Sequence, residues 1–119
     1  MTTTVCDYDE DAQEADILVS DGNFSVLCYA HPFVMSDAEF ELICFMAEDI
    51  MRAPDNTCYV EKSEDGYYAY KMCGRIIDLS KGLVAVGDII LEIADYIPKD
   101  IEEGEYIEFT VVRIDYIQE

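Results

Sequence analysis

The sequence predicts an all-β fold, a small barrel or sandwich of six to eight short, mostly antiparallel strands. The alternative is an α+β fold, if residues 36–52 are helical. Three observations favour the β fold. Short apolar, β-branched runs recur along the chain, turn signals such as Asp21-Gly22 and Asp65-Gly66 separate them, and residues 106–111 alternate apolar with polar. With 119 residues, 51% of them hydrophobic, we expect a single domain with one core.

The first 15 residues differ in composition from the rest of the chain. They hold five acids, no lysine or arginine, and few residues that could pack against a core. We therefore predict a flexible acidic N-terminal arm at residues 1–15, followed by a single β-rich domain at residues 16–119.

A β-hairpin is predicted directly after the arm. Residues 17–20 and 24–30 have strand composition, and the Asp-Gly turn at residues 21–23 joins them. Proline cannot donate a hydrogen bond to a neighbouring strand, so we expect the second strand to end at His31-Pro32.

The segment 36–52 fits two structures. Ser36 and Glu39 match a helix capping box, and the apolar residues that follow have helical spacing. The run 40–45 is also rich in strand-forming residues, as a buried strand would be. We slightly favour a strand over residues 40–50, and the sequence around Pro54 ends the segment in both cases.

The second half of the chain is predicted to be wholly β. Residues 57–62 and 67–79 form a hairpin, and residues 83–86 and 88–94 follow with a bulge or turn at Gly87. A polar loop at residues 98–104 leads into a last strand that starts at Tyr106. The run 98–111 resembles the closing strand of OB-like or SH3-like small barrels, a resemblance that concerns architecture alone.

The charge balance argues against negatively charged partners. Asp and Glu number 27 against 7 Lys and Arg, for a net charge of −20. Binding to nucleic acid depends on neutralising phosphates with Lys and Arg, so we expect no direct nucleic acid binding and no acidic membrane surface as partner. The expected partners are cationic: a basic protein, a metal, or a site that normally holds phosphates. The alternative is that the charge serves solubility alone.

The cysteines and the N-terminus bear on location. Five cysteines lie far apart, an odd number that does not suit a disulfide framework. The first residues show neither the basic region nor the apolar region of a secretion signal. We expect a cytoplasmic protein with free thiols.

No motif points to catalysis, a cofactor or a metal. Acids at alternate positions 7, 9 and 11 resemble the start of a calcium loop, but Ala12 and Leu18 stand where that loop needs glycine and glutamate. Cys28 and His31 have ligand spacing without the other two ligands of a zinc site. Phosphate loops and nucleophile elbows are missing from the sequence. We therefore expect a non-enzymatic protein with no cofactor and no metal.

Acids interleaved with tyrosines are the feature we single out. Tyrosine is common at interface hot spots, and carboxylates complement a basic partner. The plainer interpretation is that these tyrosines flank a β core while the acids fill turns. The predicted partner-binding residues are Tyr67, Tyr68, Tyr70, Tyr96, Asp100, Glu102, Glu103, Glu105, Tyr106 and Glu108.

These observations lead to one main functional hypothesis and three alternatives. The main one is a non-enzymatic acidic inhibitor or immunity protein that binds and neutralises a basic protein, such as a nuclease toxin. A phage-encoded nucleic-acid mimic that inhibits a bacterial defence enzyme would have the same composition. A small β-barrel that binds a ligand or assembles with itself is an alternative of another class. An enzyme using Cys28 or a carboxylate pair is the last, and it predicts a deep cleft.

Overall fold

The protein forms one eleven-stranded β-sheet with no helix. The computed structural model describes all residues, 1–119. The predicted all-β fold class is therefore confirmed. The α+β alternative is wrong because the segment 40–52 contains two strands and no helix. The strands are β1 (Thr2–Asp9), β2 (Glu14–Ser20), β3 (Ser25–Ala30), β4 (Phe40–Phe45), β5 (Glu48–Arg52), β6 (Tyr59–Lys62), β7 (Tyr70–Asp78), β8 (Leu83–Val86), β9 (Ile89–Ile93), β10 (Tyr106–Val111) and β11 (Arg113–Gln118).

The sheet is open, so the prediction of a small barrel or sandwich of six to eight strands is wrong. Its order is β1-β2-β3-β11-β4-β9-β8-β7-β10-β5, and β6 pairs with β7 beside this path. The additional strands have a physical origin. Two long segments are each divided by a bend, and the acidic N-terminus adds a strand of its own.

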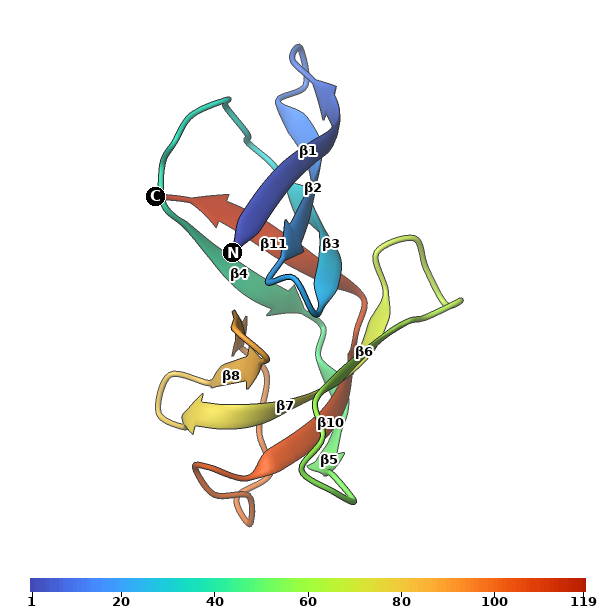
Figure 1. Ribbon diagram of the computed structural model, residues 1–119, viewed down its shortest axis with the longest axis vertical. Helices are drawn as coiled ribbons and strands as arrows, with labels where there is room; N and C mark the ends of the chain where they lie inside the picture. Colours follow the sequence, from blue (N-terminus) through green and yellow to red (C-terminus); the bar gives the residue numbers. More distant parts are fainter.

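The two bends lie side by side and give the sheet its shape. The chain turns between β4 and β5 at Met46, which has a φ of 55°, and between β10 and β11 at Val112. The Val112 N–H donates to the Phe45 carbonyl at 3.2 Å, which joins the two bends. The antiparallel pair β4–β11 thus continues into the pair β5–β10. Figure 1 shows the result, with β1, β2, β3, β4 and β11 in the upper half and β5, β7, β8 and β10 in the lower half.

One core of 24 buried residues lies inside the folded sheet. The alternation of buried and more exposed residues along the strands places the core there. In β10 every second residue is buried, and Phe109 is only 1% exposed. The same alternation in β2 buries Ile17 and Val19 while Asp16 and Leu18 face outward. None of the elements is a helix that could cross a membrane.

The side chain of Asp21 connects two turns that are far apart in the sequence. One carboxylate oxygen accepts the N–H groups of Asn23 and Phe24 at 2.8 and 2.7 Å, which closes the predicted Asp-Gly turn. The other accepts the N–H of Asp88 at 2.9 Å, in the turn between β8 and β9. These hydrogen bonds hold the pKa of Asp21 below its ordinary value, and the one from the Asp88 N–H has the largest effect.

Residues 1–15 differ from the arm we expected. Thr2–Asp9 form β1, which pairs antiparallel with β2 along its length. Tyr8 fastens this strand, because its ring packs edge-on against Phe33 with the centroids 5.4 Å apart. All other residues of β1 are exposed and its outer edge pairs with nothing. The flexibility of this segment stays a prediction.

Candidate functional site

A β-bulge at Cys6 decides which way the acids of β1 point. The register runs Val5 opposite Ile17 and then Asp7 opposite Asp16, so Cys6 is an extra residue in β1. Because side chains alternate along a strand, one inserted residue reverses the face of everything after it. The bulge therefore turns Tyr8 toward the core, opposite Ala15, and turns the neighbouring acids outward.

Four acidic residues share this outward face. Asp7 lies directly opposite Asp16, and Asp9 lies directly opposite Glu14. The two pairs are neighbours on one side of the β1–β2 hairpin. We call Asp7, Asp9, Glu14 and Asp16 the acidic quartet.

The quartet has no cation of its own. Ion pairs in the protein involve only Arg52 and Arg113, and none reaches a quartet carboxylate. Like charges directly opposite each other destabilise an antiparallel pair. The hairpin therefore holds an electrostatic cost that a cation from outside could relieve.

Three tyrosines surround the quartet with their hydroxyl groups directed at it. Tyr68 donates to Asp16 Oδ1 at 2.5 Å, and Tyr67 approaches Asp16 Oδ2 at 3.3 Å. Tyr29, opposite Asp16 in β3, donates to Glu14 at 3.1 Å. The rings also contact each other, with Tyr68 edge-on to Tyr67 at 4.7 Å and to Tyr29 at 5.7 Å. A shallow hollow of about 220 Å³ lies among the quartet, Tyr29 and Tyr68.

These tyrosines remain hydrogen-bond donors at neutral pH. Desolvation and the hydrogen bond to Asp16 raise the pKa of Tyr68 well above its ordinary value. The charge of Asp16 raises the pKa of Tyr67, and desolvation followed by the Glu14 contact raises the pKa of Tyr29. The hollow thus combines four carboxylates with aromatic walls, which suits a lysine or arginine side chain.

The arginine beside Tyr29 already has partners. Arg113 pairs with Asp115 at 2.6 Å, and its guanidinium stacks between the rings of Tyr29 and Phe45, at 5.0 and 4.6 Å from their centroids. This arrangement shows within the protein itself how an arginine binds beside Tyr29. The ion pair of Arg113 is with Asp115 and not with a carboxylate of the quartet.

The predicted partner-binding tyrosines at positions 67, 68 and 70 lie in two different environments. Tyr67 and Tyr68 lie at the quartet, where they contact Asp16 and not the Glu64 and Asp65 beside them in the sequence. Tyr70 is 7% exposed, and its hydroxyl oxygen accepts the N–H of Leu27 at 2.8 Å. Tyr70 is therefore a core residue.

The predicted partner-binding residues from Tyr96 to Glu108 lie elsewhere, and several of them make contacts within the protein. Figure 1 shows the loop between β9 and β10 at the bottom of the molecule. Glu105 binds Arg52 at 2.8 Å and accepts the N–H of Glu102, and Glu103 accepts the N–H of Leu79. Glu108 accepts a hydrogen bond from the hydroxyl of Tyr59, and the carboxylate of Asp100 lies 3.6 Å from the guanidinium of Arg52. Tyr96 is 69% exposed, and Tyr106 is half-buried.

Sequence reasoning missed the quartet and Tyr29. The acidic composition of residues 1–15 favours a flexible arm, but residues 2–5 are strand formers and the acids at positions 7 and 9 are two apart. That alternation is the signal that could have found β1. The quartet is not arranged as a metal site, since no three His, Cys, Asp or Glu side chains converge enough to hold an ion. The calcium-like spacing at positions 7, 9 and 11 therefore belongs to a strand and a turn.

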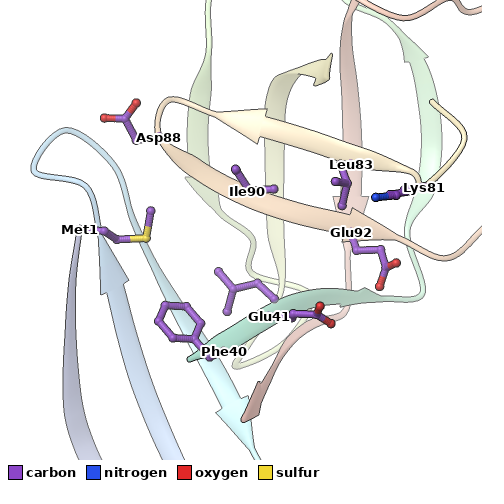
Figure 2. A pocket seen from close by; sticks show the side chains of 9 residues that line it. Met1, Phe40, Glu41, Lys81, Leu83, Asp88, Ile90 and Glu92 are labelled. Carbon is purple, nitrogen blue, oxygen red and sulfur yellow. The ribbon is translucent and has the colours of Figure 1, made fainter. Parts of the chain in front are cut away.

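A second hollow lies on the outer surface of β4, β8 and β9, with a volume of about 460 Å³. Figure 2 shows that apolar side chains make its centre, with Lys81, Glu41 and Glu92 at one end and Met1 and Asp88 at the other. The nine residues that line it are Met1, Phe40, Glu41, Leu42, Lys81, Leu83, Asp88, Ile90 and Glu92.

Comparison with known proteins adds no family to this description, since no family model, curated protein or solved structure matches the chain. The site is therefore defined by its own geometry: an acidic, tyrosine-walled surface on an open β-sheet.

Proposed function

We propose that this protein is a non-enzymatic acidic inhibitor that binds a basic protein and neutralises it, as an immunity protein does with a nuclease toxin. The observation that supports this most is the acidic quartet. Two pairs of acidic residues lie opposite each other on a hairpin and form no ion pair, while tyrosine hydroxyl groups bind two of the four carboxylates. Local departures from stable design are typical of functional sites.

The chemistry of the hollow matches a basic protein. A lysine or arginine from the partner would remove the repulsion between Asp7 and Asp16 and would pack on the ring of Tyr68 or Tyr29. The net charge of −20 would attract such a partner from a distance and speed its association. Because a nuclease is basic where it binds phosphates, the same acids would cover its substrate surface. The five free cysteines agree with a cytoplasmic setting.

A phage-encoded nucleic-acid mimic would use the same surface against a defence enzyme. The two versions share their chemistry and differ in target. Gene neighbourhood distinguishes them, because a toxin gene directly upstream favours immunity and phage structural genes favour a defence inhibitor.

A ligand-binding module is the second candidate, and the hollow in Figure 2 favours it. Its volume of about 460 Å³ lies within the range of small-molecule sites, and its centre is apolar. This candidate predicts that a small molecule raises the melting temperature of the purified protein with no protein partner present.

Affinity capture with matched variants tests the main proposal. The chain is immobilised and exposed to lysate of its native host at low salt, alongside the double variant Asp7→Asn/Asp16→Asn. A second double variant, Asp37→Asn/Glu64→Gln, changes the charge equally at exposed sites outside the quartet. We expect the wild type and the control to retain the same basic protein and the quartet variant to lose it. Capture that does not differ among the three chains, or no basic protein at all, contradicts the proposal.

A further inference from the structure

The outer edge of β1 is the one long stretch of backbone beside the quartet that pairs with nothing. β1 has eight residues, stands at one end of the sheet and pairs only with β2. In a paired strand every second residue directs its N–H and C=O away from the neighbour, so β1 offers these groups outward. Figure 1 shows β1 in front of β2 and β11, with no segment drawn over it.

This edge is poorly protected against pairing with another chain. Edge strands are usually short or carry proline or lysine, which blocks a further strand. β1 contains neither residue, and its first half, residues 2–5, consists of strand formers. Its only protective features are the bulge at Cys6 and the acids at positions 7 and 9.

The acids decide which chain the edge can accept. A second copy of this protein would bring another charge of −20 and another quartet against the first. Repulsion therefore opposes self-pairing along β1. A positively charged strand meets attraction at the same place.

We propose that β1 accepts an extended basic segment of the partner, which adds to the sheet as a further strand. Backbone hydrogen bonds to the edge would give this segment its affinity. Because side chains alternate, lysines or arginines at every second position would all lie on the face of Asp7 and Asp9, beside the quartet. This inference rests on the proposed function, whose basic partner it describes.

Amide hydrogen exchange with a defined probe tests the inference. The probe is a synthetic eight-residue peptide that alternates lysine with valine, added to the full chain at low salt. Its control has the same sequence with N-methyl groups on alternate residues, which keep the charges and remove the donors along one edge. We expect the probe to slow exchange at alternate amides of residues 2–9, by about 100-fold when free probe is 100 times its Kd. The control should leave these amides unchanged.

The peptide experiment overturns the inference if the probe does not bind, if it binds without slowing exchange in β1, or if the N-methylated control binds equally well. A concentration-dependent dimer in sedimentation that protects β1 without probe overturns it as well, in favour of a second copy. The proposed function fails on a separate result, the absence of a quartet-dependent basic protein in the capture experiment. A captured protein that leaves β1 amides unprotected would refute the added strand alone.

Discussion

Asp7 lies directly opposite Asp16 in the β1–β2 pair, and no lysine or arginine forms an ion pair with either side chain. The two acids come together only because the bulge at Cys6 turns the second half of β1 over. The structure thus brings like charges together at a place where an undisturbed register would have separated them. A surface selected for solubility alone has no need of this arrangement.

Removing one charge of this pair should stabilise the protein and weaken its binding. We expect Asp7→Asn to raise the melting temperature, because it ends the repulsion of Asp16 and Asp7 makes no hydrogen bond through its side chain that would be lost. The matched control is Asp37→Asn, an exposed aspartate outside the sheet. Thermal unfolding of the wild type, Asp7→Asn and Asp37→Asn measures the effect. A melting temperature of Asp7→Asn at or below that of Asp37→Asn contradicts the expectation.

The hydroxyl of Tyr68 should contribute measurably to stability. Tyr68→Phe keeps the ring contacts with Tyr67 and Tyr29 and removes the short hydrogen bond to Asp16. We expect a loss of about 1 kcal/mol in the free energy of unfolding by urea. Tyr67→Phe is the control and should cost less, since Tyr67 is 65% exposed and its contact is longer. Equal costs for the two variants would show that the Tyr68–Asp16 hydrogen bond has no special weight.

The ion pair between Glu105 and Arg52 predicts that the stability of the protein depends on pH. The hydrogen bond from Arg52 holds the pKa of Glu105 below its ordinary value. A lowered pKa in the folded state gives stability that is present above the ordinary pKa of glutamate and is lost as the pH falls through the lowered one. Glu105→Gln should therefore be less stable than the wild type at pH 7, with a difference that shrinks below about pH 4.

NMR titration of the Glu105 carboxyl checks the cause directly. In Arg52→Gln the pKa of Glu105 should move upward, toward the ordinary value of glutamate. Glu102→Gln is the control, because the side chain of Glu102 makes no hydrogen bond to Glu105 and its removal should leave this carboxyl bound to Arg52. An unchanged pKa in Arg52→Gln would disprove the assignment.

Gly74 is required by the packing of β7 against β8. A Cβ at this position would lie 2.7 Å from Val84 Cγ1 and 2.8 Å from the carbonyl oxygen of Ala85. We expect Gly74→Ala to cost about 1 to 3 kcal/mol of unfolding free energy. Gly66→Ala is the matched control, since its Cβ would lie at an ordinary 3.6 Å from Ala69 Cβ. Similar stability of the two variants in denaturant unfolding would contradict the packing.

Local patterns predicted those parts of the fold that depend on local chemistry. The Asp-Gly turn at Asp21 does join two strands, with Ser20 paired to Ser25, and the alternation in residues 106–111 does bury Phe109. The segment 36–52 was ambiguous because a buried strand and an amphipathic helix share the same apolar residues. Its bend at Met46 depends on β11, which lies about 70 residues further along the chain.

The candidate site was harder to predict, for a related reason. The prediction of Tyr67 and Tyr68 as binding residues rested on the acids next to them in the sequence. The acid that they bind in the structure is Asp16, 51 and 52 positions away. The face of Asp7 depends on a one-residue bulge, which a pattern of residue types does not reveal. In the β9–β10 loop, Glu105 binds Arg52 and Glu103 accepts the N–H of Leu79, contacts that the density of acids in the sequence does not reveal. The role of this loop in partner binding stays a prediction.

The most direct test of the central claim is a titration of this chain against the activity of the basic protein that it retains from its host. The account predicts that the wild type abolishes that activity near one equivalent, while Asp7→Asn/Asp16→Asn binds at least about tenfold more weakly and Asp37→Asn/Glu64→Gln does not. Affinity should also fall as salt rises. If the partner stays active when saturated with this chain, or if the quartet variant inhibits as well as the wild type, the claim is contradicted.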